Sequence, residues 1–235
     1  MGHSELKLLL NLKRFCHKRG GYREKNIAFF IFFLSFCFPS VAVTSGSEII
    51  APLGLKWGMT KNELIKKVGS IKEIESNNGI EQYLVKNTNS KINDLDAYSV
   101  GVDNKHGLTN VYMVFNIKND ESGTKSIEKY NILKKVLVSK YGEQYSEEYM
   151  WRGYNKDFIS FSDCIVNVQC GKYESLFGDD KGGSIQLRLL PDSSGEFFNI
   201  FLLYKSPAIK LIKEEMENNY NSEVQKKAQE LSDSL

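Results

Sequence analysis

Residues 53–69, LGLKWGMTKNELIKKVG, specify where one helix begins and where it ends. Thr60 stands at an N-cap position with Glu63 three residues later, the spacing of a capping box in which each side chain satisfies a free amide of the first turn. Gly69 occupies the position after the helix, where a left-handed backbone favours glycine. We therefore predict a short helix between Thr60 and Gly69, followed directly by a strand near 71–75.

The residues just before the cap are predicted to be structural as well. Met59 and Leu64 flank the cap at the spacing of a hydrophobic staple. Trp57 and Gly58 precede it, and we expect Trp57 to contact the core. Trp57, Gly58, Thr60, Glu63 and Gly69 are thus assigned to stability and to no chemistry.

The first 42 residues form a separate segment. Seven Lys and Arg residues precede the apolar run 27–38, IAFFIFFLSFCF, and small residues follow Pro39. This order predicts a secretory signal peptide, cleaved after Ala42 or Ser45, with a linker over 43–52. One alternative is an uncleaved membrane anchor, since 27–43 approaches the lower limit of a spanning helix. Another is a lipoprotein acylated at Cys37.

Charge and composition narrow the classes of partner. The chain is 41% hydrophobic and 26% charged, which is typical of a globular protein. Without residues 1–42, 24 basic and 27 acidic residues remain, a net charge of −3 with histidine neutral. The remaining sequence has no excess of basic residues that would indicate binding to nucleic acid. We expect another protein as partner, and a membrane only if the N-terminal segment is retained or lipidated.

The cysteines point to an oxidising compartment. Cys16 and Cys37 lie in the predicted signal peptide, which leaves Cys164 and Cys170 as a pair. In an exported chain such a pair predicts a disulfide. A metal site or a redox pair is the alternative, but the spacing is not CxxC and no histidine is near. The bridge requires the chain to turn between the two residues, and we expect that turn at Asn167.

Periodicity along 53–235 predicts one α+β domain: an antiparallel sheet with helices packed on one face and a closing C-terminal helix. A second helix is predicted over 124–141 with Gly142 as its stop. A third is predicted over 206–232, with Ser206 as cap, Pro207 at its first position and a break near Asn218. The segments 53–118 and 124–204 are possible tandem helix–strand repeats. The predicted strands are 80–86, 97–102, 111–117, 149–154, 158–168, 185–190 and 197–204.

The segment WGMTKNELIKKVG resembles the helix start of small secreted bacterial domains. These include the SmpA/OmlA outer-membrane assembly lipoproteins and the tandem-repeat β-lactamase-inhibitor-like proteins. The resemblance covers residues 53–69, and the chain departs from the lipoproteins in lacking a good lipobox and a proline after Gly69. It implies a secreted, non-catalytic protein-binding fold.

Residue types required for catalysis are sparse after position 42. His106 is the single histidine there, in a predicted hairpin turn over 103–107, and we expect it to be solvated. A Ser-His-Asp or zinc site would have to be built on that residue alone. Carboxylates such as Glu147 and Glu148 leave a carboxylate-based hydrolase open, and Asp179, Asp180 and Asp192 lack calcium-loop spacing. We predict no enzyme, no cofactor and no metal.

The aromatic residues are the remaining candidates for a functional site, and they belong either to the core or to a recognition surface. Tyr149, Trp151, Arg152 and Tyr154 lie on one predicted strand, and these are the residue types enriched in binding hot spots. We therefore predict a periplasmic or secreted protein-binding module, an immunity or inhibitor protein, which recognises its partner through that strand. An envelope-assembly factor is the alternative among binding proteins.

Overall fold

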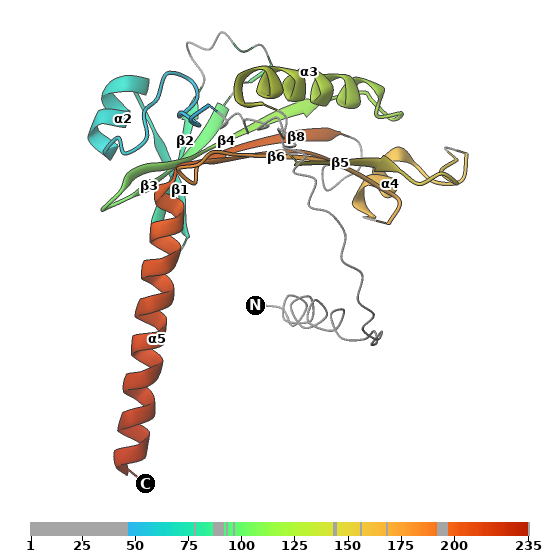
Figure 1. Ribbon diagram of the computed structural model, residues 1–235. Coiled ribbons are helices and arrows are strands. Elements are labelled where there is room, and N and C mark those ends of the chain that lie inside the picture. Colours follow the sequence, from blue (N-terminus) through green and yellow to red (C-terminus); the bar gives the residue numbers. More distant parts are fainter. Residues whose placement is uncertain are drawn as a thin grey trace, which may run out of the picture. The chain divides into compact units, whose positions relative to one another are not determined.

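The computed structural model describes residues 47–77, 79–86, 92, 94–95, 97–142, 145–155, 157–167, 169–191 and 197–234. They belong to one unit within residues 43–235. The predicted signal peptide, its cleavage site, Cys16, Cys37 and linker residues 43–46 lie outside the described residues. Within them, an eight-stranded antiparallel sheet and four helices confirm the α+β class (Figure 1).

The strands are arranged as two meanders joined through their last strands. The order in the sheet is β1-β2-β3-β4-β8-β7-β6-β5, so β4 and β8 are neighbours at its centre. Each half begins with a helix that four strands follow, and the second half has α4 inserted after β5. The elements are α2 (Lys61–Val68), β1 (Lys72–Asn77), β2 (Ile80–Lys86), β3 (Ala97–Asp103), β4 (Gly107–Ile117), α3 (Thr124–Tyr141), β5 (Tyr145–Met150), α4 (Phe161–Val166), β6 (Gly171–Gly178), β7 (Ser184–Pro191), β8 (Phe198–Lys205) and α5 (Ala208–Ser234).

The core lies between one face of the sheet and helices α2 and α3, which Figure 1 shows on the same side. Alternate residues of the central strands point into it, because successive side chains of a strand face opposite ways. Phe115 of β4 lies opposite Ile200 of β8, and both are fully buried. Tyr130, Leu137 and Tyr141 of α3 are buried at the predicted helical spacing.

The capping box of α2 is confirmed. The Thr60 amide donates to the Glu63 carboxylate at 2.8 Å, and the Glu63 amide donates to Thr60 Oγ1 at 3.3 Å. Gly69 has the positive φ, 88°, that the sequence predicts. Trp57 packs against the core, and its indole Nε1 donates to the carbonyl of Ile49 at 2.8 Å.

The prediction of a linker up to residue 52 is wrong for its last residues. Ile49 and Ala51 are buried in the core, at 1% and 5% exposure. The Ile49 amide also donates to the carboxylate of Asp179, in the turn between β6 and β7, at 2.6 Å. The apolar run of residues 49–51 is too short to show a helix or strand period, so the sequence did not mark it as core.

The predicted strands 149–154 and 158–168 are wrong. The first strand lies earlier, as β5, and the second region forms the helix α4. Ser160 is the N-cap of α4, and its hydroxyl accepts a hydrogen bond from the Asp163 amide at 3.0 Å. This capping signal prevails over the short apolar run that resembles a strand. Strand β6 was not predicted at all.

The disulfide between Cys164 and Cys170 is confirmed. Cys164 lies on α4, which ends at Asn167, and the chain turns there before β6 begins at Gly171. The turn brings the two Cα atoms to 4.9 Å, within bonding range. The sequence did not predict this helix, whose C-cap at Asn167 begins the turn toward Cys170. A disulfide is typical of proteins in oxidising compartments.

Helix α5 is continuous from Ala208 to Ser234, so the predicted break near Asn218 is wrong. The helix begins at Ala208, one residue after the predicted first position at Pro207, and the Ser206 carbonyl accepts from the Ile209 amide at 3.2 Å in the turn before it. The Ser206 hydroxyl has no hydrogen-bond partner among the described residues, which corrects the predicted side-chain cap. Only Ile212 of α5 is buried. None of the helices in the described ranges is both long and apolar enough to cross a bilayer.

Candidate functional site: the open face of the sheet

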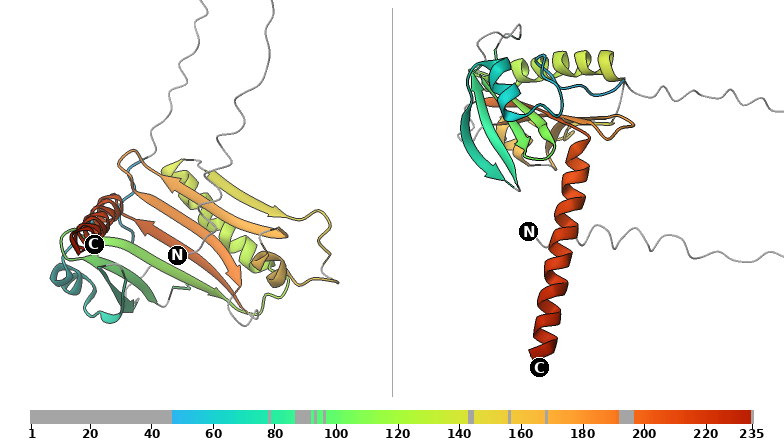
Figure 2. Two further views of the ribbon diagram at one scale, coloured as in Figure 1. Left: turned by 90° about the horizontal axis from the view of Figure 1, so that it is seen from below. Right: turned by 90° about the vertical axis from the view of Figure 1, so that its left-hand side faces the viewer.

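One face of the sheet carries no covering helix across its central strands. The left panel of Figure 2 shows these strands in open view, with α5 projecting from one end. The strand register aligns side chains of this face in rows. Tyr112 of β4 lies opposite Leu203 of β8, Leu203 opposite Gln186 of β7, and Gln186 opposite Leu176 of β6. We call this surface the open face; it holds Tyr112, Val114, Phe201, Leu203, Gln186, Arg188, Lys172, Glu174, Leu176, Tyr145, Glu147 and Tyr149.

Aromatic residues occupy the centre of the open face. The rings of Tyr112 and Phe201 stack with centroids 5.7 Å apart and planes inclined by 10°. Phe201 also lies opposite Arg188 on β7. Burial raises the pKa of the Tyr112 hydroxyl, and the positive charge of Arg188 opposes that rise. Tyrosine and arginine are the residue types enriched in protein-binding hot spots.

A charged network lies beside the aromatic stack. Glu174 accepts hydrogen bonds from Lys172 at 2.8 Å and from the Gln186 amide at 2.6 Å, and Arg188 lies 3.3 Å from it. Burial opposes the ionisation of Glu174, but these donors outweigh it and lower its pKa. Lys172 also binds Glu147 at 2.5 Å, and the two carboxylates raise its pKa. The charges at this end therefore compensate one another.

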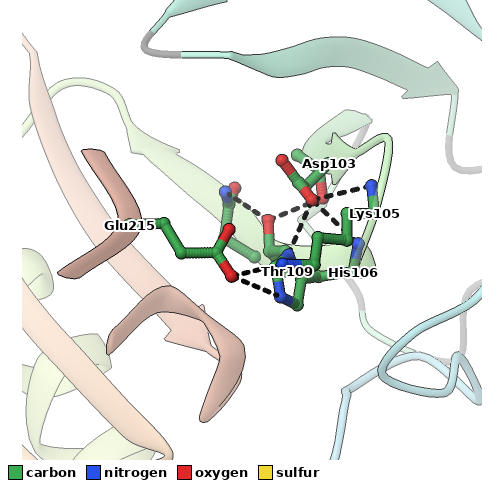
Figure 3. A network of polar contacts seen from close by, with 7 residues as sticks. Asp103, Lys105, His106, Thr109 and Glu215 are labelled. Atoms are coloured by element: carbon green, nitrogen blue, oxygen red, sulfur yellow. Dashed lines mark hydrogen bonds and ion pairs between the residues drawn. The ribbon is translucent and has the colours of Figure 1, made fainter. Parts of the chain in front are cut away.

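A second polar network holds the base of α5, drawn in Figure 3. Glu215 of α5 forms an ion pair with Lys105, and its carboxylate lies 3.9 Å from His106 Nε2. His106 Nδ1 lies 2.8 Å from the carboxylate of Asp103, which also accepts from the backbone amides of residues 105 and 106. Burial opposes ionisation of Asp103, but these hydrogen bonds hold its pKa below the ordinary value.

The expectation of a solvated His106 is wrong, because only 15% of its side chain is exposed. The turn is where the sequence predicts it, but the carboxylate of Glu215 on α5 lies 3.9 Å from the imidazole. Within the described ranges, no hydroxyl or thiol group forms a hydrogen bond with the ring, whose contacts are both with carboxylates. These contacts link the β3–β4 turn to α5.

The predicted recognition residues are not on one strand. Tyr149 belongs to β5 and lies on the open face opposite Lys172. Trp151 follows the strand and is 60% exposed, which excludes the core alternative for this side chain. Arg152 is exposed and Tyr154 is partly exposed, both in the turn that begins at Trp151. The structure thus brings only Tyr149 to the open face.

Sequence reasoning missed Phe201 and Arg188 because their position depends on the pairing of β8 with β4 and β7. The sequence FNIFLLYK is apolar on both sides of the strand, so only the structure reveals the alternation of buried and partly exposed residues along it. It places Phe201, Leu203 and Lys205 together on one side of β8.

The other candidate sites have structural explanations. Asp179 accepts hydrogen bonds from the amides of Ile49, Lys181 and Gly183, so it organises a turn. Glu148 accepts from Lys134 and Tyr130. No group of metal-binding side chains occurs in the described part of the chain. A hollow of about 420 Å³ is lined by one helix alone, through Thr124, Ile127, Glu128, Asn131, Ile132 and Lys135.

No protein family, characterised protein or solved structure is detectably similar to the chain. The resemblance of residues 53–69 to secreted bacterial domains stays a prediction.

Proposed function

We propose that this protein is a periplasmic or secreted protein-binding module, an immunity or inhibitor protein, and that it binds its partner through the open face. The observation that carries the proposal is the Tyr112–Phe201 stack beside Arg188 on a sheet face without a covering helix. Such a combination of rigid aromatic rings and a guanidinium group is typical of the core of a protein interface.

Two further observations support export and binding. The Cys164–Cys170 disulfide agrees with an oxidising destination, and the basic and apolar pattern of residues 1–42 supplies the route. The polar groups of the open face, Glu174 above all, are held by neighbouring side chains in fixed positions. A surface organised in this way needs little ordering on binding, which favours affinity.

The test begins with capture from a periplasmic extract by the oxidised protein produced from the full chain. The bait is compared with a double variant, Tyr112→Ala with Phe201→Ala, and with a control, Ile132→Ala with Val136→Ala on the outer side of α3. The control residues are apolar and 52% and 59% exposed, so their substitution removes apolar surface away from the open face.

A protein retained by the wild type and the control, but lost by the open-face variant, is then purified for calorimetry. We expect the open-face substitutions to weaken its binding by about 2 kcal/mol or more. Equal binding by all three baits would refute the open face as the interface.

Two alternatives have defined outcomes in the same experiment. Capture of an outer-membrane assembly component would favour an envelope-assembly factor over an inhibitor. Turnover of a cell-wall or glycan substrate, lost on Glu147→Gln or Glu148→Gln, would overturn the binding module in favour of a carboxylate-based hydrolase.

A further inference from the structure

The imidazole of His106 lies between two carboxylates that belong to different elements, as Figure 3 shows. Its Nδ1 lies 2.8 Å from the carboxylate of Asp103 in the β3–β4 turn, and its Nε2 lies 3.9 Å from the carboxylate of Glu215 on α5. Only 15% of the His106 side chain is exposed. Water and salt therefore screen these contacts less than they screen a pair at an open surface.

The contact with Asp103 decides which nitrogen of the neutral ring carries the proton. Burial opposes the ionisation of Asp103, but the hydrogen bonds from His106 and Lys105 lower its pKa. An ionised carboxylate only accepts hydrogen bonds, so Nδ1 is the nitrogen that donates in the 2.8 Å contact. A neutral imidazole has one ring proton, and Nε2 of neutral His106 is therefore unprotonated.

The charge of His106 consequently determines the sign of its contact with Glu215. In the neutral ring the lone pair of Nε2 faces the carboxylate, and two acceptors form no hydrogen bond. Protonation gives Nε2 an N–H group and the ring a positive charge, so the same contact becomes attractive. An imidazole ordinarily makes this change between about pH 8 and about pH 5.

Three charged residues surround the ring: Asp103 and Lys105 in the turn, and Glu215 on α5. The loop before α2 meets the same turn through its backbone, where the Leu108 amide donates to the carbonyl of residue 59 at 2.8 Å. Carboxylates and ammonium groups ordinarily keep their charge near neutral pH, whereas an imidazole does not. His106 is therefore the switching group of this network.

The base of α5 is held by a small number of contacts within the described residues. Ile212 is the one buried residue of the helix, and residues 213–234 are all exposed. The ion pair between Lys105 and Glu215 is open to solvent, with 68% and 46% of the two side chains exposed. Exposed pairs of this kind contribute little to stability. A second, better shielded cation beside Glu215 thus changes how firmly the helix is held.

We propose that His106 is a pH-sensitive clamp on α5: the protonated ring holds Glu215 and fixes the base of the helix at about pH 5.5, and the neutral ring releases it at about pH 8. This inference goes beyond the proposed function and does not depend on any partner. The chain bends at residues 206 and 207, between β8 and α5. The release stays local, because the Ser206 amide remains bound to the carbonyl of Thr109 on β4 at 2.8 Å.

The first experiment measures hydrogen exchange by mass spectrometry on the oxidised full-chain protein, at about pH 5.5 and about pH 8. Protection factors remove the pH dependence of the chemical exchange step, and a peptide from β4 reports any change in global stability. Relative to that peptide, we expect residues 213–219 to be about threefold better protected at the lower pH, the effect of one partly exposed ion pair. Glu217→Gln, a matched change at an exposed position of α5, should leave this difference unchanged.

Two variants separate the clamp from other effects of pH. Glu215→Gln leaves the turn intact, so the pH dependence of α5 protection should disappear while the His106 ring still titrates by NMR. His106→Gln should abolish the dependence as well. Equal protection of wild-type α5 at both pH values would overturn the clamp, and so would a pH dependence that persists in Glu215→Gln.

The second experiment determines the tautomer of His106 directly. Nitrogen chemical shifts of the neutral ring, measured by NMR, should show a protonated Nδ1 and an unprotonated Nε2. The opposite tautomer would refute the clamp, because an Nε2–H group would then face Glu215 at every pH.

Discussion

Two phenylalanines three residues apart on β8 distinguish the core face from the open face. Phe198 is 1% exposed and packs against Phe161, with ring centroids 5.2 Å apart. Phe198→Ala should therefore leave an enclosed cavity and cost about 3–5 kcal/mol of unfolding free energy. Phe201 is partly exposed and stacks on Tyr112. Phe201→Ala leaves a hollow that water fills. The unfolding free energy therefore loses only the contributions of hydrophobic transfer and ring stacking, about 2 kcal/mol.

Urea unfolding of the oxidised protein, followed by far-UV circular dichroism, measures the loss of unfolding free energy in each variant. The two losses can be compared directly when the m-values are equal. Sedimentation analysis of the wild type accompanies it, because a second molecule seated on the open face would bury Phe201 as well. If the two substitutions lower the unfolding free energy by amounts within about 0.5 kcal/mol of each other, Phe201 is a core residue and the open face is not open.

Four smaller perturbations test the rest of the structure. Thr60→Ala removes the capping box of α2 and should lower the unfolding free energy by about 0.5–2 kcal/mol in a denaturant titration. Reduction of the Cys164–Cys170 bridge releases a short loop and should cost about 2 kcal/mol by the chain-entropy relation, which is checked by unfolding with and without reductant. Trp151→Ala should cost less than about 1 kcal/mol, because the ring is largely exposed; a loss of 3 kcal/mol or more would place it in the core. The pKa of Glu174 is lowered from 4.5, so its stabilisation is present above that pH and lost as the pH falls through the folded-state pKa. Glu174→Gln should make the urea midpoint depend less on pH in the acid range. An unchanged dependence of the midpoint on pH would contradict this role of Glu174.

Local sequence signals predicted the parts of the fold that local interactions determine. The Thr60–Glu63 capping box and the helix stops at Gly69 and Gly142 act within one turn, so α2 and α3 were predicted at nearly their true bounds. The same reasoning failed over 145–178, where short apolar runs fit a strand and a helix equally well. There the Ser160 cap and the disulfide decide the structure.

Local sequence signals could not predict the candidate site, because its residues come together only when particular strands pair. Tyr112 and Phe201 are 89 positions apart in the sequence, and they stack because β4 pairs with β8 at one particular register. No local pattern specifies which two strands of eight become neighbours.

Two contacts on one side of α5 hold the base of this helix against the sheet. Ile212 and Glu215 are three residues apart and therefore share one side of the helix. The first is buried, and the second is held by Lys105 and His106 of the β3–β4 turn, as Figure 3 shows. These contacts fix the rotation of the first turns of α5 about the helix axis. Ile212 is the one buried residue of the helix, so the ion pair of Glu215 with Lys105 is the main polar contact that holds α5 to the β3–β4 turn. The network around His106 thus determines how the exposed remainder of α5 leaves the sheet.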